Sequence, residues 1–317
     1  MNRNFKTSSI TEAAMITGIL VIIAYLSSFF SLVMFFFPTP AIILAKRKGL
    51  KYASLALIAS DILVSMLLGV QTGLIFLILY TPLAIALAYG ICNEEDVNKT
   101  ILFGSAAYMI SFVVLILLLN AIMGVNFVQQ LSDAYNESIV MMKDMLANMP
   151  GGLNGANVQE MITSFDEMGT MMTYVITNVF PAIMIVTSVI TSYINYIVAS
   201  KFAKRFNINI KQPEGLSRFS FPKTFMVAMA GMLLLSFLLS ILKINIEIIQ
   251  LNLFMVVFAA MFFQGFAVLK FYLEKSNMSK FFRRMILVMV LFMSAGLSQV
   301  LAVIGLIDLA IDLRKLK

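Results

Sequence analysis

Apolar stretches about as long as a bilayer is thick recur along this chain. A helix that crosses a hydrocarbon core of about 30 Å needs roughly 20 apolar residues. The apolar stretches run approximately over residues 10–31, 32–45, 52–69, 73–91, 100–124, 171–200, 224–242, 250–272 and 285–311. Because 61% of the 317 residues are hydrophobic and only 12% are charged, the chain has too few charged side chains to cover a water-soluble fold. We therefore expect an all-α, polytopic transmembrane bundle with about 8–10 membrane segments.

The composition excludes several kinds of chemistry. The chain has no His, which excludes imidazole metal ligands and Ser-His-Asp triads. Its single Cys92 cannot form an intrachain disulfide or a multi-thiolate metal site. No P-loop motif is present. We therefore expect no catalytic residues, no metal site and no bound cofactor, and the basic loops need no nucleic-acid partner because membrane topology accounts for them.

The first two apolar stretches are fused into one run of 36 residues (10–45), which Pro38 and Pro40 interrupt. A single helix of that length would be about 54 Å long and would overshoot the bilayer. Basic residues flank both ends of the run, so we expect it to cross twice or to turn back. Ser9 and Glu12 match the S-x-x-E capping box, which predicts that the first helix begins there.

Basic residues are distributed unevenly between the two sides of the expected bundle. They gather at 46–51, 201–223 and 270–284, which all lie inside if the N-terminus is cytoplasmic. This orientation places 18 of the 23 Lys and Arg residues inside. The stretch 285–311 is either one crossing, which leaves the basic tail outside, or two short helices hinged near 296–299, which return the tail inside. The sequence leaves both open.

Residues 125–170 form the only long connection, and the orientation above places them outside. Apolar residues recur at helical spacing from Phe127 to Leu146, and Pro150 should end that helix. A second amphipathic helix is predicted to start near Asn157. We expect an interfacial helix pair that rests on lipid, in preference to a lid or a partner-docking surface.

Asp61 is the ionisable residue that lies deepest in an apolar stretch. It follows Lys51 by ten residues, or about 15 Å of helix, which places it near the bilayer midplane. No basic residue lies at the centre of another segment. A carboxyl group at this depth is costly and is a functional candidate by default. Asp61 therefore either receives a ligand or a proton, or forms a buried structural hydrogen bond.

Three side-chain amides are further candidates for ligand binding: Asn120, Asn178 and Gln264. Asn120 and Asn178 lie toward the outer ends of their segments and could meet in one outward-facing pocket. The favoured alternative for each amide is a hydrogen bond that bridges two transmembrane helices, and the same holds for Asn195.

Several short motifs resemble the YybS-like family of uncharacterised bacterial membrane proteins (domain of unknown function DUF2232). They are residues 11–14 (TEAA), 36–44 (FFPTPAIIL), 46–49 (KRKG), 305–308 (GLID) and 312–315 (DLRK). The resemblance spans nearly the whole chain. It implies a multi-pass protein of the bacterial plasma membrane and assigns no activity.

The N-terminal part is similar to the substrate-binding S components of energy-coupling-factor vitamin transporters. That similarity implies a six-helix core over residues 1–204 and a C-terminal transmembrane extension over 205–317. It also implies that Ala14 and Gly18 form a small-residue face that docks a coupling subunit. A small molecule or lipid would then bind from the outer side, at Asp61, Asn120 and Asn178. The alternative is a non-transporting scaffold for envelope or signalling partners.

Overall fold

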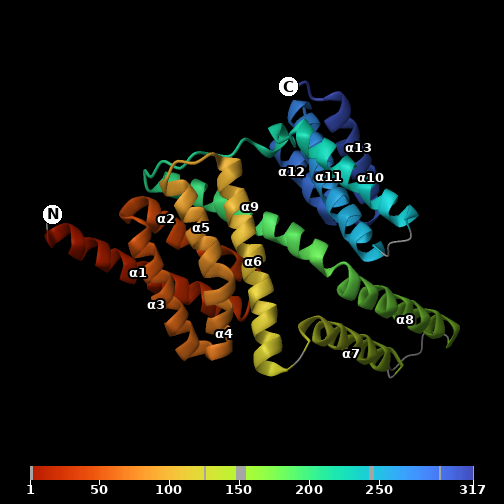
Figure 1. The fold of residues 1–317 in the computed structure, drawn as a ribbon, viewed down its shortest axis with the longest axis horizontal. Helices are drawn as coiled ribbons and strands as arrows, with labels where there is room; N and C mark the ends of the chain where they lie inside the picture. The colour runs from red at the N-terminus through yellow and green to blue at the C-terminus, as the bar shows by residue number, and fades with distance from the viewer. Residues whose placement is uncertain (1–2, 125, 148–154, 243–245, 293, 317) are drawn as a thin grey trace. The chain divides into compact units, whose positions relative to one another are not determined.

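The computed structural model describes residues 3–124, 126–147, 155–242, 246–292 and 294–316. Every regular element in these ranges is helical, which confirms the predicted all-α fold (Figure 1). The elements are α1 (Arg3–Ser27), η1 (Ser31–Phe36), α2 (Pro38–Lys48), α3 (Leu50–Leu68), α4 (Val70–Ile75), η2 (Phe76–Tyr80), α5 (Thr81–Cys92), α6 (Val97–Met123), α7 (Phe127–Ala147), α8 (Gly155–Asn178), α9 (Phe180–Arg205), η3 (Leu216–Arg218), α10 (Lys223–Ile241), α11 (Glu247–Lys275), α12 (Lys280–Phe292) and α13 (Ser294–Ile311).

Within the described residues, seven helical spans are long and apolar enough to cross a membrane. They are Thr7–Ser27, Leu50–Leu68, Val70–Cys92, Val97–Ile122, Phe180–Arg205, Lys223–Ile241 and Glu247–Lys275. The 11-residue α2 and the apolar stretch Gly296–Ile311 are shorter. The chain is therefore a polytopic helical membrane protein.

The chain divides into two compact units. Unit 1 comprises Met1–Ala134 and Met184–Pro213, and unit 2 comprises Tyr135–Ile183 and Glu214–Lys317. The division into an S-component-like core at 1–204 and an extension at 205–317 stays a prediction.

The fused apolar run at the N-terminus is broken into α1, η1 and α2. Pro38 lies in the first turn of α2, where its missing N–H costs no helical hydrogen bond. The last turn of α2 lies beside the start of α1, because Glu12 pairs with Arg47 at 3.0 Å and with Lys48 at 3.5 Å. The run thus turns back, as predicted. A single Gly49 with φ of +97° then links α2 to α3, a backbone conformation that glycine adopts most readily.

The capping box predicted at Ser9 is wrong. The first helix already extends from Arg3, so Ser9 lies within α1 and is buried. Glu12 serves instead as the counter-ion of the two basic residues at the end of α2. The sequence motif cannot distinguish these roles, because the pairing joins residues 35 and 36 positions apart.

The core of unit 1 contains a row of aromatic rings that joins three helical segments. Phe37 is fully buried and packs against Phe76 and Tyr80, with ring centroids 4.6 and 6.3 Å apart. Tyr80 in turn lies 5.8 Å from Tyr108 of α6. Such tilted ring pairs add to the burial of their apolar area. They therefore anchor the short α2 inside the unit.

Unit 2 is built on the close packing of α11 against α13. A Cβ atom on Gly265 would lie 1.8 Å from the Leu301 carbonyl oxygen, and one on Gly305 would lie 2.0 Å from the Met261 carbonyl oxygen. Only glycine allows the two backbones to approach this closely. The packing therefore explains Gly305 of the GLID motif.

The C-terminal stretch is formed by two helices, α12 and α13. The Tyr272 hydroxyl, near the end of α11, donates to the Leu313 carbonyl just after α13, at 3.1 Å. The end of α13 therefore lies at the same end of unit 2 as the end of α11, where α12 begins. Two short helices are therefore found, but the predicted hinge at 296–299 lies within α13. The side of the membrane on which the basic tail lies stays a prediction.

The connection between α6 and α9 contains the two predicted amphipathic helices, α7 and α8, drawn in olive and green in Figure 1. Lys143 of α7 and Asp166 of α8 form an ion pair, and the Thr173 hydroxyl donates to Asn136 at 3.3 Å. The helix end predicted at Pro150 lies outside the described residues. The location of this pair on the outer membrane surface stays a prediction.

Candidate functional site

Asp61 lies inside unit 1 on α3, with only 3% of its surface exposed. The Thr81 hydroxyl, at the start of α5, donates a hydrogen bond to Asp61 Oδ2 at 2.8 Å. Asp61 Oδ1 is buried and has no hydrogen-bond partner among the described residues. Carboxylate oxygens accept several hydrogen bonds each when they are ionised. Asp61 is therefore an incompletely satisfied acceptor inside an apolar unit.

The helix that provides Thr81 is distorted just before this residue. Residues Phe76–Tyr80 form a π-helical turn in which the Thr81 N–H donates to the Phe76 carbonyl, five residues earlier. Pro82 follows and has no N–H to donate. Single π turns in helices are frequent at functional sites, because they redirect one side chain and loosen the backbone hydrogen bonds around it. Here the redirected segment presents Thr81 to Asp61.

Space beside Asp61 is limited on the side of α4. A Cβ atom on Gly73 would lie 1.8 Å from Ser65 Oγ and 2.8 Å from the Asp61 carbonyl oxygen. Helices α3 and α4 are therefore in direct backbone contact one turn beyond Asp61. On this side there is no room for a large ring, only for a single ion or one protruding group.

The amides of α6 and α9 have local structural partners. Asn120 Oδ1 accepts the Phe127 N–H at 3.0 Å, which satisfies a backbone donor at the start of α7. Asn120 is also about 18 Å along α6 from Tyr108, which packs against Tyr80, the residue before the Asp61 partner Thr81. Asn195 is buried and donates to the Phe35 carbonyl at 2.9 Å, so it bridges helices as expected.

Asn178 belongs to unit 2, whereas Asp61 and Asn120 belong to unit 1. Its side chain donates to the Tyr174 carbonyl at 3.0 Å within its own helix. The structure therefore gives Asn178 a local partner and does not assemble the three residues of the predicted pocket within one unit.

Asn252 of α11 is an amide with a structural role that the sequence did not indicate. It donates to the Asn178 carbonyl at 2.6 Å and accepts the Ala182 N–H at 2.8 Å. These are the two groups that an unbroken helix would pair with each other. The Asn252 amide therefore fills the break between α8 and α9 at Pro181. An amide two residues into the apolar stretch 250–272 was the available signal.

Gln264 is fully buried in unit 2 and belongs to a polar network. Its amide donates to Asp308 Oδ2 at 2.7 Å and accepts the Phe221 N–H at 3.1 Å. Asp308 also pairs with Arg314 at 2.8 Å, and their side chains are 1% and 0% exposed. Arg314 donates further to the Ser217 carbonyl at 2.8 Å. Gln264 therefore holds structure together and is not positioned as a free ligand group.

This network explains the C-terminal motifs. Asp308 ends GLID and Arg314 lies within DLRK, so the two motifs contain the two partners of one buried ion pair. Both Asp308 oxygens accept hydrogen bonds, from the Arg314 backbone and guanidinium and from Gln264. A buried ion pair is tolerated only when its remaining donors and acceptors are satisfied in this way.

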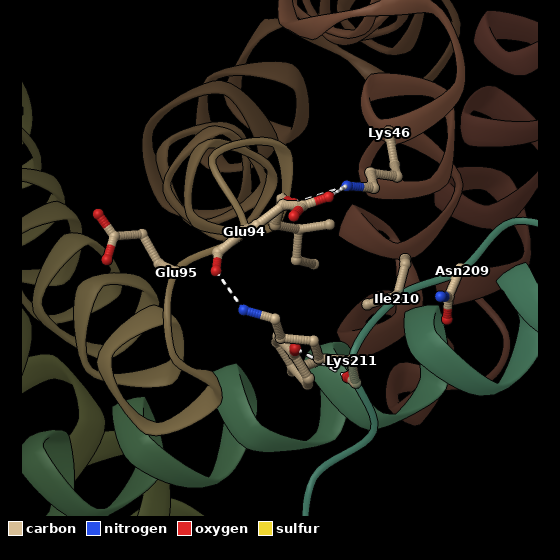
Figure 2. Close-up of a pocket in the computed structure, with 8 residues that line it drawn as sticks. Lys46, Glu94, Glu95, Asn209, Ile210 and Lys211 are labelled. Atoms are coloured by element: carbon tan, nitrogen blue, oxygen red, sulfur yellow. Dashed lines mark hydrogen bonds and ion pairs between the residues drawn. The ribbon is translucent and has the colours of Figure 1, made fainter.

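A cavity of about 110 Å³ lies between the turn after α5 and the chain after α9 (Figure 2). Lys46 reaches the Glu94 side chain at 3.2 Å, and Lys211 donates to the Glu94 main-chain carbonyl (Figure 2). Glu95 points away from both lysines in the same view. The cavity has room for a few water molecules. Its two lysines already bind Glu94, so the cluster joins three chain segments of unit 1: the end of α2, the turn after α5 and the chain after α9.

Ala14 and Gly18 lie on an exposed face of α1. Both residues are exposed, and a Cβ atom on Gly18 would meet no atom within 4 Å. The face is therefore open to lipid or to a partner helix. In the described residues, no three His, Cys, Asp or Glu side chains form a group that could hold a metal ion.

Comparisons with known proteins agree with these membrane features. A family profile described as "Predicted membrane protein (DUF2232)" matches residues 15–309. The chain is also 23% identical over 313 residues to "Uncharacterized protein YybS" of Bacillus subtilis (strain 168), and the match covers 98% of each chain. No solved structure matches the chain. Similarity to the S components is not among these matches.

Proposed function

This chain belongs to the DUF2232 family of predicted membrane proteins, and we propose that its unit 1 binds a small ligand inside the membrane. The observation that carries the proposal is Asp61 Oδ1, a buried acceptor with no hydrogen-bond partner among the described residues. A ligand that presents a cation or an N–H group would complete this carboxyl group. The function is binding and transport, without catalysis.

The surroundings of Asp61 support a ligand role over a purely structural one. A structural carboxyl group in a membrane helix normally has both oxygens satisfied, because unpaired polar atoms are costly there. In the described part of the chain, the Asp61 side chain has one hydrogen-bond partner, Thr81, which follows a π turn. Strained or unsatisfied groups persist where function maintains them. The close packing at Gly73 favours an ion or a single protruding ammonium group.

Ligand binding is tested by thermal unfolding of the full chain in detergent, followed by reaction of Cys92 with a thiol-reactive dye. The probes are sodium chloride, lithium chloride, choline chloride as the ionic-strength control, and a panel of B vitamins. We compare the wild type with Asp61→Asn and with Glu137→Gln, an exposed acid-to-amide control on α7. A ligand at 100 times its Kd stabilises the folded state by about 2.7 kcal/mol.

We expect at least one probe other than choline chloride to raise the unfolding temperature of the wild type and of Glu137→Gln, but not of Asp61→Asn. Equal stabilisation of Asp61→Asn, or no response to any probe, would refute the proposed site.

We further propose that unit 1 acts as an S-component-like subunit and docks a coupling protein through Ala14 and Gly18. Gly18→Leu is the informative variant, because a Cβ atom at this exposed position meets no atom within 4 Å, so the fold should stay intact. Affinity purification should recover an ATPase-bearing complex with the wild type and lose it with Gly18→Leu. Recovery of envelope or signalling proteins, insensitive to Gly18→Leu and without a ligand response, would favour the scaffold alternative instead.

A further inference from the structure

A groove of about 770 Å³ lies in unit 1, along the first turns of α1. Helix α2 and the chain after α9 complete its walls, through Arg47 and Ile43 and through Phe206. Neither Asp61 nor the Ala14 and Gly18 face lines it. The groove is therefore distinct from both features on which the proposed function rests.

The lining of the groove changes from polar to apolar along α1. Thr7 and Thr11 line the groove at the first turn of the apolar span, and Met15 and Ile19 line it further along. Thr7 and Ile19 are 12 residues apart, or about 18 Å of helix. If α1 crosses the membrane, the polar end lies at headgroup level and the apolar end lies within the hydrocarbon. A phospholipid has the same order of polarity.

At the polar end, Glu12 and Arg47 line the groove, and Lys48 lies beside it on the same carboxylate, so the three groups together carry one positive charge. Arg47 and Lys48 share one counter-ion, Glu12, at 3.0 and 3.5 Å. The Arg47 side chain is 52% exposed, and its pairing uses Nη1. A guanidinium group has five N–H donors and binds phosphate oxygens in a bidentate geometry. Arg47 therefore has donors left for a phosphate, and Lys48 adds a second positive charge near it.

We propose that this groove binds one anionic phospholipid. Its phosphate contacts Arg47 at the polar end, and one acyl chain lies along Met15 and Ile19. Basic pockets between transmembrane helices select anionic headgroups by the same combination of charge and apolar contact. A zwitterionic lipid gains less, because its ammonium group faces the same Arg47 and Lys48.

The test is native mass spectrometry of the full chain released from detergent. The protein is titrated with palmitoyl-oleoyl phosphatidylglycerol and with the phosphatidylcholine of the same acyl chains. Arg47→Gln removes the phosphate contact, and Lys51→Gln removes the same charge from an exposed position outside the groove. Met15→Trp fills the apolar end at a position that is 66% exposed, so it keeps the test valid if Arg47→Gln folds poorly.

We expect the wild type and Lys51→Gln to bind phosphatidylglycerol at least about fivefold more tightly than phosphatidylcholine. One basic residue that contacts an anionic headgroup accounts for a difference of this size. Arg47→Gln should abolish this preference, and Met15→Trp should weaken binding of phosphatidylglycerol. Equal binding of both lipids by the wild type, or equal losses in Arg47→Gln and Lys51→Gln, would overturn the proposal. Displacement of phosphatidylglycerol by sodium phosphate alone would also overturn it, because the site would then recognise phosphate without the acyl chains. A dimer of this chain that Arg47→Gln dissociates, and that phosphatidylglycerol does not dissociate, would overturn it too, because the groove would then be a dimer contact.

Discussion

The buried pair of Asp308 and Arg314 makes the sharpest stability prediction. Asp308→Asn keeps an oxygen that can accept from Gln264, but it removes the counter-ion of Arg314. The guanidinium then remains buried without a compensating charge. We expect this single atom exchange to destabilise unit 2 strongly.

The magnitude follows from burial. The Asp308 and Arg314 side chains are 1% and 0% exposed, so solvent does not screen their interaction. Removing one partner of a buried ion pair costs about 3–5 kcal/mol. The exposed pair between Lys270 and Glu274 of α11 is the matched reference, because its side chains are 28% and 48% exposed and its atoms are 3.9 Å apart. Exposed pairs four residues apart on a helix contribute only about 0.3–0.5 kcal/mol.

The assay is unfolding in mixed micelles by sodium dodecyl sulfate, followed by far-UV circular dichroism because the chain has no Trp. Asp308→Asn should lower the free energy of unfolding by about 3–5 kcal/mol, and Glu274→Gln by less than about 1 kcal/mol. The double variant Asp308→Asn with Arg314→Met removes both charges and should recover part of the loss. Equal effects of Asp308→Asn and Glu274→Gln would refute the assignment of a buried ion pair.

Two further predictions concern helix contacts in unit 2. Gly265→Ala places a Cβ atom 1.8 Å from a backbone oxygen of α13 and should lower the free energy of unfolding by at least about 2 kcal/mol in the same assay. The control is Gly231→Ala on α10, whose Cβ atom meets no atom within 4 Å, so this variant should be neutral or stabilising. Asn252→Leu leaves the Asn178 carbonyl and the Ala182 N–H unpaired and should cost about 1–2 kcal/mol, together with faster amide hydrogen exchange at Ala182. A neutral Gly265→Ala would contradict the close packing of α11 against α13. Unchanged hydrogen exchange at Ala182 in Asn252→Leu would contradict the hydrogen bond from Ala182 to Asn252.

The sequence predicts the helical architecture well because lipid imposes strict rules on it. Apolar length and the basic residues at both ends predicted that the first run crosses twice or turns back, and the structure shows that it turns back. Local motifs were less reliable. The Ser9 to Glu12 pattern matched a helix start, but Glu12 pairs with residues of α2 that are far away in the sequence. Tertiary electrostatics thus outweighed local capping.

The partners of buried polar groups were the part that sequence could not supply. Gln264 was identified as an isolated amide, yet its partner Asp308 is 44 residues away on another helix. Asn252 was missed because its role depends on a break between α8 and α9 that only the packed helices reveal. Asp61 was predicted to lie near the bilayer midplane; the structure shows that it is buried in unit 1, and its partner Thr81 was not indicated by the sequence.

Asp61 and Asp308 differ in how completely the protein satisfies them, and this difference predicts opposite responses to the same substitution. Asp308 accepts hydrogen bonds at both oxygens and has a counter-ion, so Asp308→Asn disrupts a complete network. Among the described residues, the Asp61 side chain accepts one hydrogen bond, from Thr81, and Asn can still accept it. Asp61→Asn should therefore change the free energy of unfolding by less than about 1 kcal/mol while it abolishes the ligand response. A loss as large as that of Asp308→Asn would mean that Asp61 is a structural residue of unit 1, and the proposed binding site would have to be abandoned.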